Sequence, residues 1–155
     1  MRAERIAMLY GLLKQSRTTK MEDQGRMRIL RIIKALRPAA QEYEADLKEA
    51  REKMKDGQFD AMTAKAEKWQ MEGAKAISDD EKMAVNAYFA RYNKAVAKAA
   101  DALAGKQKKA EFDKLSQDEF QKLISSNDYT GEQMELLDDM VVEQQPGTVS
   151  VFSKQ

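Results

Sequence analysis

The chain has 155 residues, no cysteine and no histidine, and its 27 Lys and Arg residues against 26 Asp and Glu give a formal net charge of +1. The lack of thiols and imidazoles excludes disulfide frameworks, most zinc, haem and iron–sulfur sites, and the Ser-His and Cys-His nucleophile systems. We therefore expect a protein that is not an enzyme and that binds neither a metal ion nor a cofactor.

The composition is typical of an all-α protein, with 43% apolar and 34% charged residues but only seven Gly and two Pro. We predict an all-α fold in which a long kinked helix forms an antiparallel helical hairpin or bundle with shorter covering helices. A single helical domain is expected over residues 1–143. Residues 144–155 are expected to form a flexible tail, with a short C-terminal β-strand as the alternative.

The first predicted element is a short amphipathic helix over residues 3–16, in which Ile6, Leu9 and Leu13 recur at helical spacing. The charged residues before it and the missing small-residue cleavage site indicate that it is not a secretory signal. No apolar run approaches the ~18–20 residues that span a bilayer, so we expect no membrane association.

The second element is a long helix from Thr19 to Lys55. Thr19 followed by Glu22 has the spacing of a capping box, which predicts the start of the helix. Pro38 removes a backbone donor, and predicts a kink or a brief interruption near Arg37. The apolar seam nevertheless continues at steps of three and four residues through Ile29, Ile32, Leu36, Ala40, Tyr43, Leu47, Ala50 and Met54.

Four further helices are predicted after Asp56-Gly57. The third runs from Phe59 to Ile77, and the fourth from the Ser78–Glu81 capping box to about Ala104. Residues 105–115 are expected to be a linker or a fraying helix end. Two short helices then begin at the capping boxes Ser116–Glu119 and Thr130–Gln133.

Charge is distributed unevenly along the chain. Residues 1–40 hold ten Lys and Arg against three Asp and Glu, a net of +7, and residues 111–145 hold two against ten, a net of −8. Such a chain is able to pair its own ends, associate with copies of itself or attract charged partners. The long predicted helices also leave apolar surface that one bundle does not cover, so we predict a homo-oligomer.

One face of the long helix is the candidate site for a protein partner or an anion. Its cations fall within about 140° of the helix circumference, opposite the apolar seam, with two apolar residues among them. A solvated helix face, or pairing with the acidic C-terminal third, is the commoner explanation of such an arc. Nucleic acid is not expected, because the rest of the chain is not basic and no aromatic residues alternate with the arginines. The candidate residues are Arg26, Met27, Leu30, Arg31, Lys34 and Arg37.

Five stretches support a resemblance to a known group: Thr19–Asp23, Ile29–Pro38, Ala64–Gly73, Glu81–Phe89 and Phe120–Asp128. In these the chain resembles small uncharacterised helical proteins encoded by phages and prophages of gut Bacteroidetes-type bacteria. The resemblance implies a phage origin and assigns no functional residue.

With that origin, we expect a non-catalytic interaction protein such as an assembly chaperone, a scaffold or a small virion component. The alternative is an inhibitor of host defence that binds a host protein or an anionic nucleotide signal through the face from Arg26 to Arg37. Either protein is expected in the cytoplasm of a phage-infected or lysogenic host, or in the virion.

Overall fold

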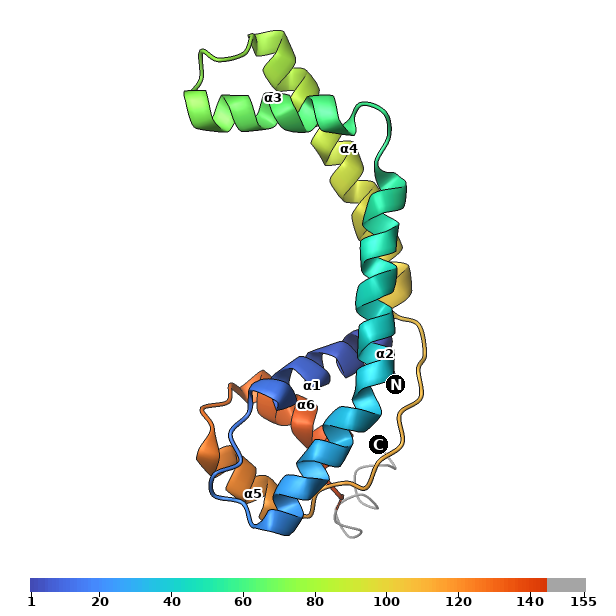
Figure 1. Ribbon diagram of the computed structural model, residues 1–155, viewed down its shortest axis with the longest axis vertical. Coiled ribbons are helices and arrows are strands. Elements are labelled where there is room, and N and C mark those ends of the chain that lie inside the picture. Colours follow the sequence, from blue (N-terminus) through green and yellow to red (C-terminus); the bar gives the residue numbers. More distant parts are fainter. Residues whose placement is uncertain (145–155) are drawn as a thin grey trace, which may run out of the picture. The chain divides into compact units, whose positions relative to one another are not determined.

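The computed structural model describes residues 1–144, and in that part of the chain it contains six α-helices and no sheet (Figure 1). The all-α prediction is confirmed. No helix among these residues is long and apolar enough to cross a membrane. The helices are α1 (Ala3–Gln15), α2 (Asp23–Met54), α3 (Phe59–Glu72), α4 (Asp79–Ala104), α5 (Gln117–Ser126) and α6 (Gly131–Val141).

The described chain forms two compact units. The first takes Met1–Tyr43 together with the chain from Lys106 onward, and the second takes Glu44–Gly105, so α2 belongs to both. A single cooperative domain over residues 1–143 stays a prediction. The predicted tail 144–155 lies outside the described residues, except for Gln144.

The first unit has a core of aliphatic side chains from α1, the first half of α2, α5 and α6. These helices lie beside one another in Figure 1. The apolar positions recur at three and four residues, so one face of each helix is buried. The fully buried large side chains are Ile6, Leu9, Leu13, Ile32, Leu36, Leu115, Leu123, Leu137, Val141 and Val142.

Residues 107–115 (the 107–115 segment) are irregular but held at both ends, which corrects the expectation of a linker or a fraying helix end. Gln107 forms an antiparallel β-bridge with Arg2, and Leu115 forms a parallel one with Val142. The backbone N–H of Leu115 donates to Val141 O at 2.7 Å, and the Leu115 carbonyl accepts from Glu143 N at 2.8 Å. The Leu115 side chain is also fully buried, and Ala110 and Phe112 are partly buried against the core, so the segment is anchored to the first unit.

The long helix begins at Asp23, so the predicted start at Thr19 is wrong. Residues 19 and 20 form a turn instead, in which Met21 N donates to Thr18 O at 3.1 Å. The helix continues through Pro38 to Met54 without the brief interruption that was one of the two predicted outcomes.

The second unit contains the second half of α2 together with α3 and α4. The predicted extension of α3 to Ile77 is wrong, because the helix ends at Glu72, where Gly73 has a φ of 95°. Left-handed backbone of this kind favours glycine and terminates the helix. The capping box of Ser78 and Glu81 is present at the start of α4. Phe59 packs on Phe89 and Tyr92 with ring centroids 6.1 and 5.1 Å apart.

Candidate functional site

The structure separates the predicted basic face of α2 into two groups. Arg26 folds back along the chain, where its guanidinium donates to Thr18 O at 3.0 Å and Thr19 O at 3.1 Å. Arg37 donates from Nε to the hydroxyl of Tyr10 at 3.3 Å, which lowers the pKa of that phenol. These two guanidinium groups therefore hold neighbouring segments of the first unit.

Arg26 and Arg37 are themselves exposed, and the other four predicted residues are exposed without such contacts to the described chain. Met27 is 47% exposed and Leu30 is 40% exposed, as their placement opposite the seam predicted, and Arg31 and Lys34 are exposed beside them. Their spacing of i, i+3, i+4 and i+7 puts all four on one line along the helix. We call Met27, Leu30, Arg31 and Lys34 the α2 stripe.

Arg31 and Lys34 are cations without an acidic partner, since neither forms an ion pair with any residue from 1 to 144. Two exposed apolar side chains next to two unpaired cations are suited to a partner with acidic and apolar groups on one face. The helix that carries them is anchored in the core, because Ile29 and Ile32 on its opposite side are buried there.

The acidic C-terminal third does pair with basic residues of the first forty. Arg28 donates to Glu119 Oε1 at 2.8 Å, and these side chains are only 24% and 17% exposed. In a second pair the charges are exchanged: Lys122 of the acidic third contacts Glu22 of the first forty residues at 3.2 Å. Intramolecular pairing therefore accounts for Arg28, at the flank of the predicted face, but not for the α2 stripe.

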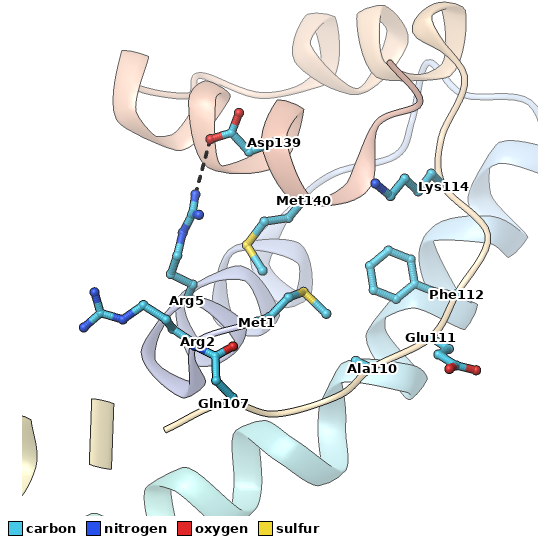
Figure 2. A pocket seen from close by; sticks show the side chains of 10 residues that line it. All are labelled: Met1, Arg2, Arg5, Gln107, Ala110, Glu111, Phe112, Lys114, Asp139 and Met140. Atoms are coloured by element: carbon cyan, nitrogen blue, oxygen red, sulfur yellow. Dashed lines mark hydrogen bonds and ion pairs between the residues drawn. The ribbon is translucent and has the colours of Figure 1, made fainter. Parts of the chain in front are cut away.

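Sequence reasoning missed a cavity of about 630 Å³ in the first unit (Figure 2). Its walls come from the N-terminus, α1, the 107–115 segment and α6. The volume falls within the ~300–1,000 Å³ of typical ligand pockets. The lining residues are Met1, Arg2, Arg5, Gln107, Ala110, Glu111, Phe112, Lys114, Asp139 and Met140.

Apolar side chains, a lysine and an ion pair surround this cavity. Met1, Phe112 and Met140 supply apolar surface, and Lys114 extends its ammonium group toward Met140 across the opening (Figure 2). Arg5 donates to Asp139 Oδ2 at 3.4 Å, in a pair whose side chains are 41% and 63% exposed. The sequence carries no periodic signal here, because the 107–115 segment is not helical and pairs with residues that are not its neighbours in the chain, Arg2 at one end and Val142 at the other.

The smaller hollows show less apolar surface. One of about 310 Å³ surrounds the Arg28–Glu119 pair and Lys122, and another of about 170 Å³ lies in the second unit beside Asp56 and Tyr88. The Tyr88 hydroxyl donates to Asp56 Oδ1 at 2.7 Å. Burial, together with this bond, raises the pKa of Tyr88 to about 12, and the same bond lowers the pKa of Asp56.

The remaining pKa shifts have separate local causes. The helix cap at Ser78 lowers the pKa of Glu81, and burial raises the pKa of Tyr129. Lys108 lowers the pKa of Glu42 through a contact of 2.7 Å, and Glu22 with Asp118 raises the pKa of Lys122. Among residues 1–144, no three carboxylates converge in a way that would hold a metal ion. The shifted groups stabilise local contacts of the fold and do not gather around one reaction centre.

Comparisons with protein-family models, with curated proteins and with solved structures found no match to this chain.

Proposed function

We propose that this is a non-catalytic interaction protein that acts through helical protein–protein contacts, and that the α2 stripe is its contact surface. The observation that carries the proposal is the position of Met27, Leu30, Arg31 and Lys34 on one exposed line of a helix whose opposite face is buried in the core. A partner helix with apolar residues at the same spacing and acidic flanks would cover this surface. An assembly chaperone, a scaffold or a small virion component works through contacts of this kind.

The experiment compares two charge-reversed variants of the full chain. Arg31→Glu/Lys34→Glu changes the stripe, and Lys48→Glu/Arg51→Glu makes the same change in charge at exposed positions farther along α2. Each tagged protein is used to capture partners from cells that produce the natural protein, with quantification by mass spectrometry. We expect a specific partner that the first variant loses by about tenfold or more and the second retains. Equal capture by both variants would refute the stripe as the contact surface.

The identity of the captured partner distinguishes a role in phage assembly from a role as an inhibitor of host defence. A virion or capsid-assembly protein supports the assembly role, and a host defence protein supports the inhibitor. An anionic nucleotide has less support as a ligand, because Arg26 and Arg37 are held by other groups and only Arg31 and Lys34 remain for a phosphate. Thermal shift of the full chain against a panel of nucleotides tests that alternative, and the stripe variant supplies its control.

A homo-oligomer belongs to the same proposal and is supported by the second unit. Met71 and Met83 are 85% and 71% exposed, and no residue of α3 is buried. Exposed methionines of this kind are adaptable contact surfaces. Light scattering over a range of concentrations should show a species larger than the 17.6 kDa chain, and a monomer at every concentration would refute this part of the proposal.

A further inference from the structure

We propose that the cavity of Figure 2 is a second binding site, distinct from the α2 stripe, which takes an extended peptide segment of a partner protein with alternating apolar and acidic residues. Three features of the site favour such a peptide: the backbone of the 107–115 segment, the apolar side chains in the cavity, and the cations beside it.

The first argument concerns the backbone of the 107–115 segment. Strand-like pairing holds it at both ends, through Gln107 to Arg2 and through Leu115 to Val142. Between these bridges, residues 109–114 make no backbone–backbone hydrogen bond with any residue from 1 to 144. Of these backbone groups, the Lys114 carbonyl accepts from Arg28 Nη1 at 3.4 Å. A row of backbone N–H and C=O groups without backbone partners, between two strand-paired residues, is the feature to which an added strand binds.

The second argument concerns the side chains that stand over this backbone. Ala110 and Phe112 alternate along the segment and meet Met1 and Met140 in the cavity. In an extended peptide every second side chain points to the same face, so its apolar residues would enter the cavity together. The two methionines can adjust to apolar side chains of different shapes.

The third argument concerns charge. Arg2 and Lys114 line the cavity, are exposed and form no ion pair with a described residue. Lys114 extends its ammonium group toward Met140, whereas the guanidinium of Arg2 extends outward from the edge of the cavity, away from Met1 and Phe112 (Figure 2). Of the two acids at the cavity, Asp139 is paired with Arg5 and Glu111 turns its carboxylate away from the opening (Figure 2). Acidic residues between the apolar ones of the peptide would therefore reach Arg2 on one side and Lys114 on the other.

The test uses the full chain and a fluorescein-labelled synthetic peptide of eight residues in which valine and glutamate alternate, with binding followed by fluorescence anisotropy. Two peptides serve as controls: one with lysine in place of glutamate, and one with N-methyl groups on every backbone nitrogen. We expect saturable binding of the valine–glutamate peptide that each control weakens by about tenfold or more. The N-methylated peptide keeps the side chains and loses the backbone donors, so it separates strand addition from simple charge attraction.

Two variants locate the site. Lys114→Glu changes an exposed side chain and should weaken binding by about tenfold, whereas Arg31→Glu/Lys34→Glu removes two cations from the α2 stripe and should leave binding unchanged. Hydrogen exchange adds a readout on the backbone itself, because the amides of residues 109–114 should become protected when the peptide binds. Circular dichroism of each variant should show the same helix content as the natural chain.

Three results would overturn this proposal. The first is no binding of the valine–glutamate peptide, and the second is equal binding of the N-methylated peptide, which would mean that no strand is added. The third is binding by a chain that ends at Gln144 but not by the full chain, which would mean that residues 145–155 and not a partner occupy the site. None of these results bears on the α2 stripe, so this proposal and the proposed function fail independently.

Discussion

At the scale of single residues, the Tyr88–Asp56 hydrogen bond is the clearest link between elements of the second unit. Tyr88 is 5% exposed, and its hydroxyl donates to Asp56 Oδ1 at 2.7 Å. Asp56 also accepts from Gln58 N at 2.9 Å, so its carboxylate ties the turn between α2 and α3 to α4. A buried phenol that donates to a carboxylate favours the protonated tyrosine and the ionised aspartate.

This hydrogen bond predicts an alkaline loss of stability. The pKa of Tyr88 is raised from 10.0 to about 12 in the folded chain. The contribution is therefore complete below about pH 10 and is lost as the pH rises toward about 12, because the unfolded chain releases this proton first. Thermal unfolding at a series of pH values should show this loss in the natural chain and a smaller loss in Tyr88→Phe. Parallel profiles for the two proteins would contradict the assignment.

At low pH the same hydrogen bond predicts a loss of stability as the pH falls. Because the pKa of Asp56 is lowered in the folded chain, its contribution is present above the ordinary aspartate value and is lost as the pH falls through the folded value. Asp56→Asn should remove this dependence, because it removes the carboxylate that titrates. Tyr88→Phe should reduce it, because it removes the donor that lowers the pKa of Asp56. Thermal unfolding of both variants at a series of low pH values measures these changes.

Residues of the candidate site show what helical periodicity predicts and what it does not. The spacing placed Met27 and Leu30 outside the core, and their exposure confirms it. It could not predict that Arg28 meets Glu119, which is 91 positions away in the chain. Periodicity reports the direction in which a Cα–Cβ bond points, whereas a long arginine side chain selects its partner from whatever the tertiary fold brings near.

At the scale of elements, three of the four predicted capping boxes are present, at Ser78, Ser116 and Thr130. The fourth, at Thr19, is overridden by tertiary contacts. Asn127 and Ser126 at the end of α5 accept from Arg17 N at 2.8 Å and Lys20 N at 3.2 Å, and Met21 is buried. These contacts hold residues 17–21 in a turn, so the first helical residue comes four positions after the predicted one.

This difference predicts unequal effects of the same substitution. Thr130→Ala removes a side-chain acceptor from Gln133 N and should lower the free energy of unfolding by about 1 kcal/mol. Thr19→Ala removes no cap and should change it by less than about 0.5 kcal/mol. Urea denaturation of the two variants measures both values. A larger loss at Thr19 than at Thr130 would show that the helix start in solution is the predicted one.

Two glycines should respond to alanine with opposite signs. Gly73 has a φ of 95°, a left-handed conformation in which a Cβ is strained, so Gly73→Ala should destabilise the chain by about 1 kcal/mol. Gly11 lies inside α1 with nothing within 4 Å of an added Cβ, so Gly11→Ala should stabilise it by about 0.5–1 kcal/mol. Thermal unfolding of both variants checks the signs, and a stabilised Gly73→Ala would contradict the observed end of α3.

At the scale of the whole molecule, the buried side chains are concentrated in the first unit. The second unit contributes only Ile77, Val85, Tyr88 and Ala104 to the buried hydrophobic residues of the described chain. The apolar seams predicted that both units are helical, although α3 ends at Glu72 and not at Ile77. They did not predict this unequal burial, because a seam of given spacing looks the same whether another helix covers it fully or partly.

The 107–115 segment illustrates the remaining gap between sequence and structure. The expectation of a linker or a fraying helix end over residues 105–115 followed from Gly105 and the run from Lys106 to Lys109. Leu115 is nevertheless fully buried, and pairs through its backbone with Val141 and Glu143. Irregular backbone that is fixed by partners far along the chain leaves no local pattern, so neither this segment nor the cavity beside it was predictable from the sequence.

The unequal burial predicts how the molecule opens. Native-state hydrogen exchange should show the slowest amides in α1 and in α6, whose buried side chains include Ile6, Leu9, Leu137 and Val141, and much faster amides in α3, which has no buried residue. Little apolar surface becomes exposed when α3 opens, so its opening free energy should lie well below that of global unfolding. With increasing denaturant the exchange of α3 should stay nearly constant, while that of α1 and α6 should follow global unfolding. Equal protection and equal denaturant dependence in all six helices would instead support one cooperative domain over residues 1–143.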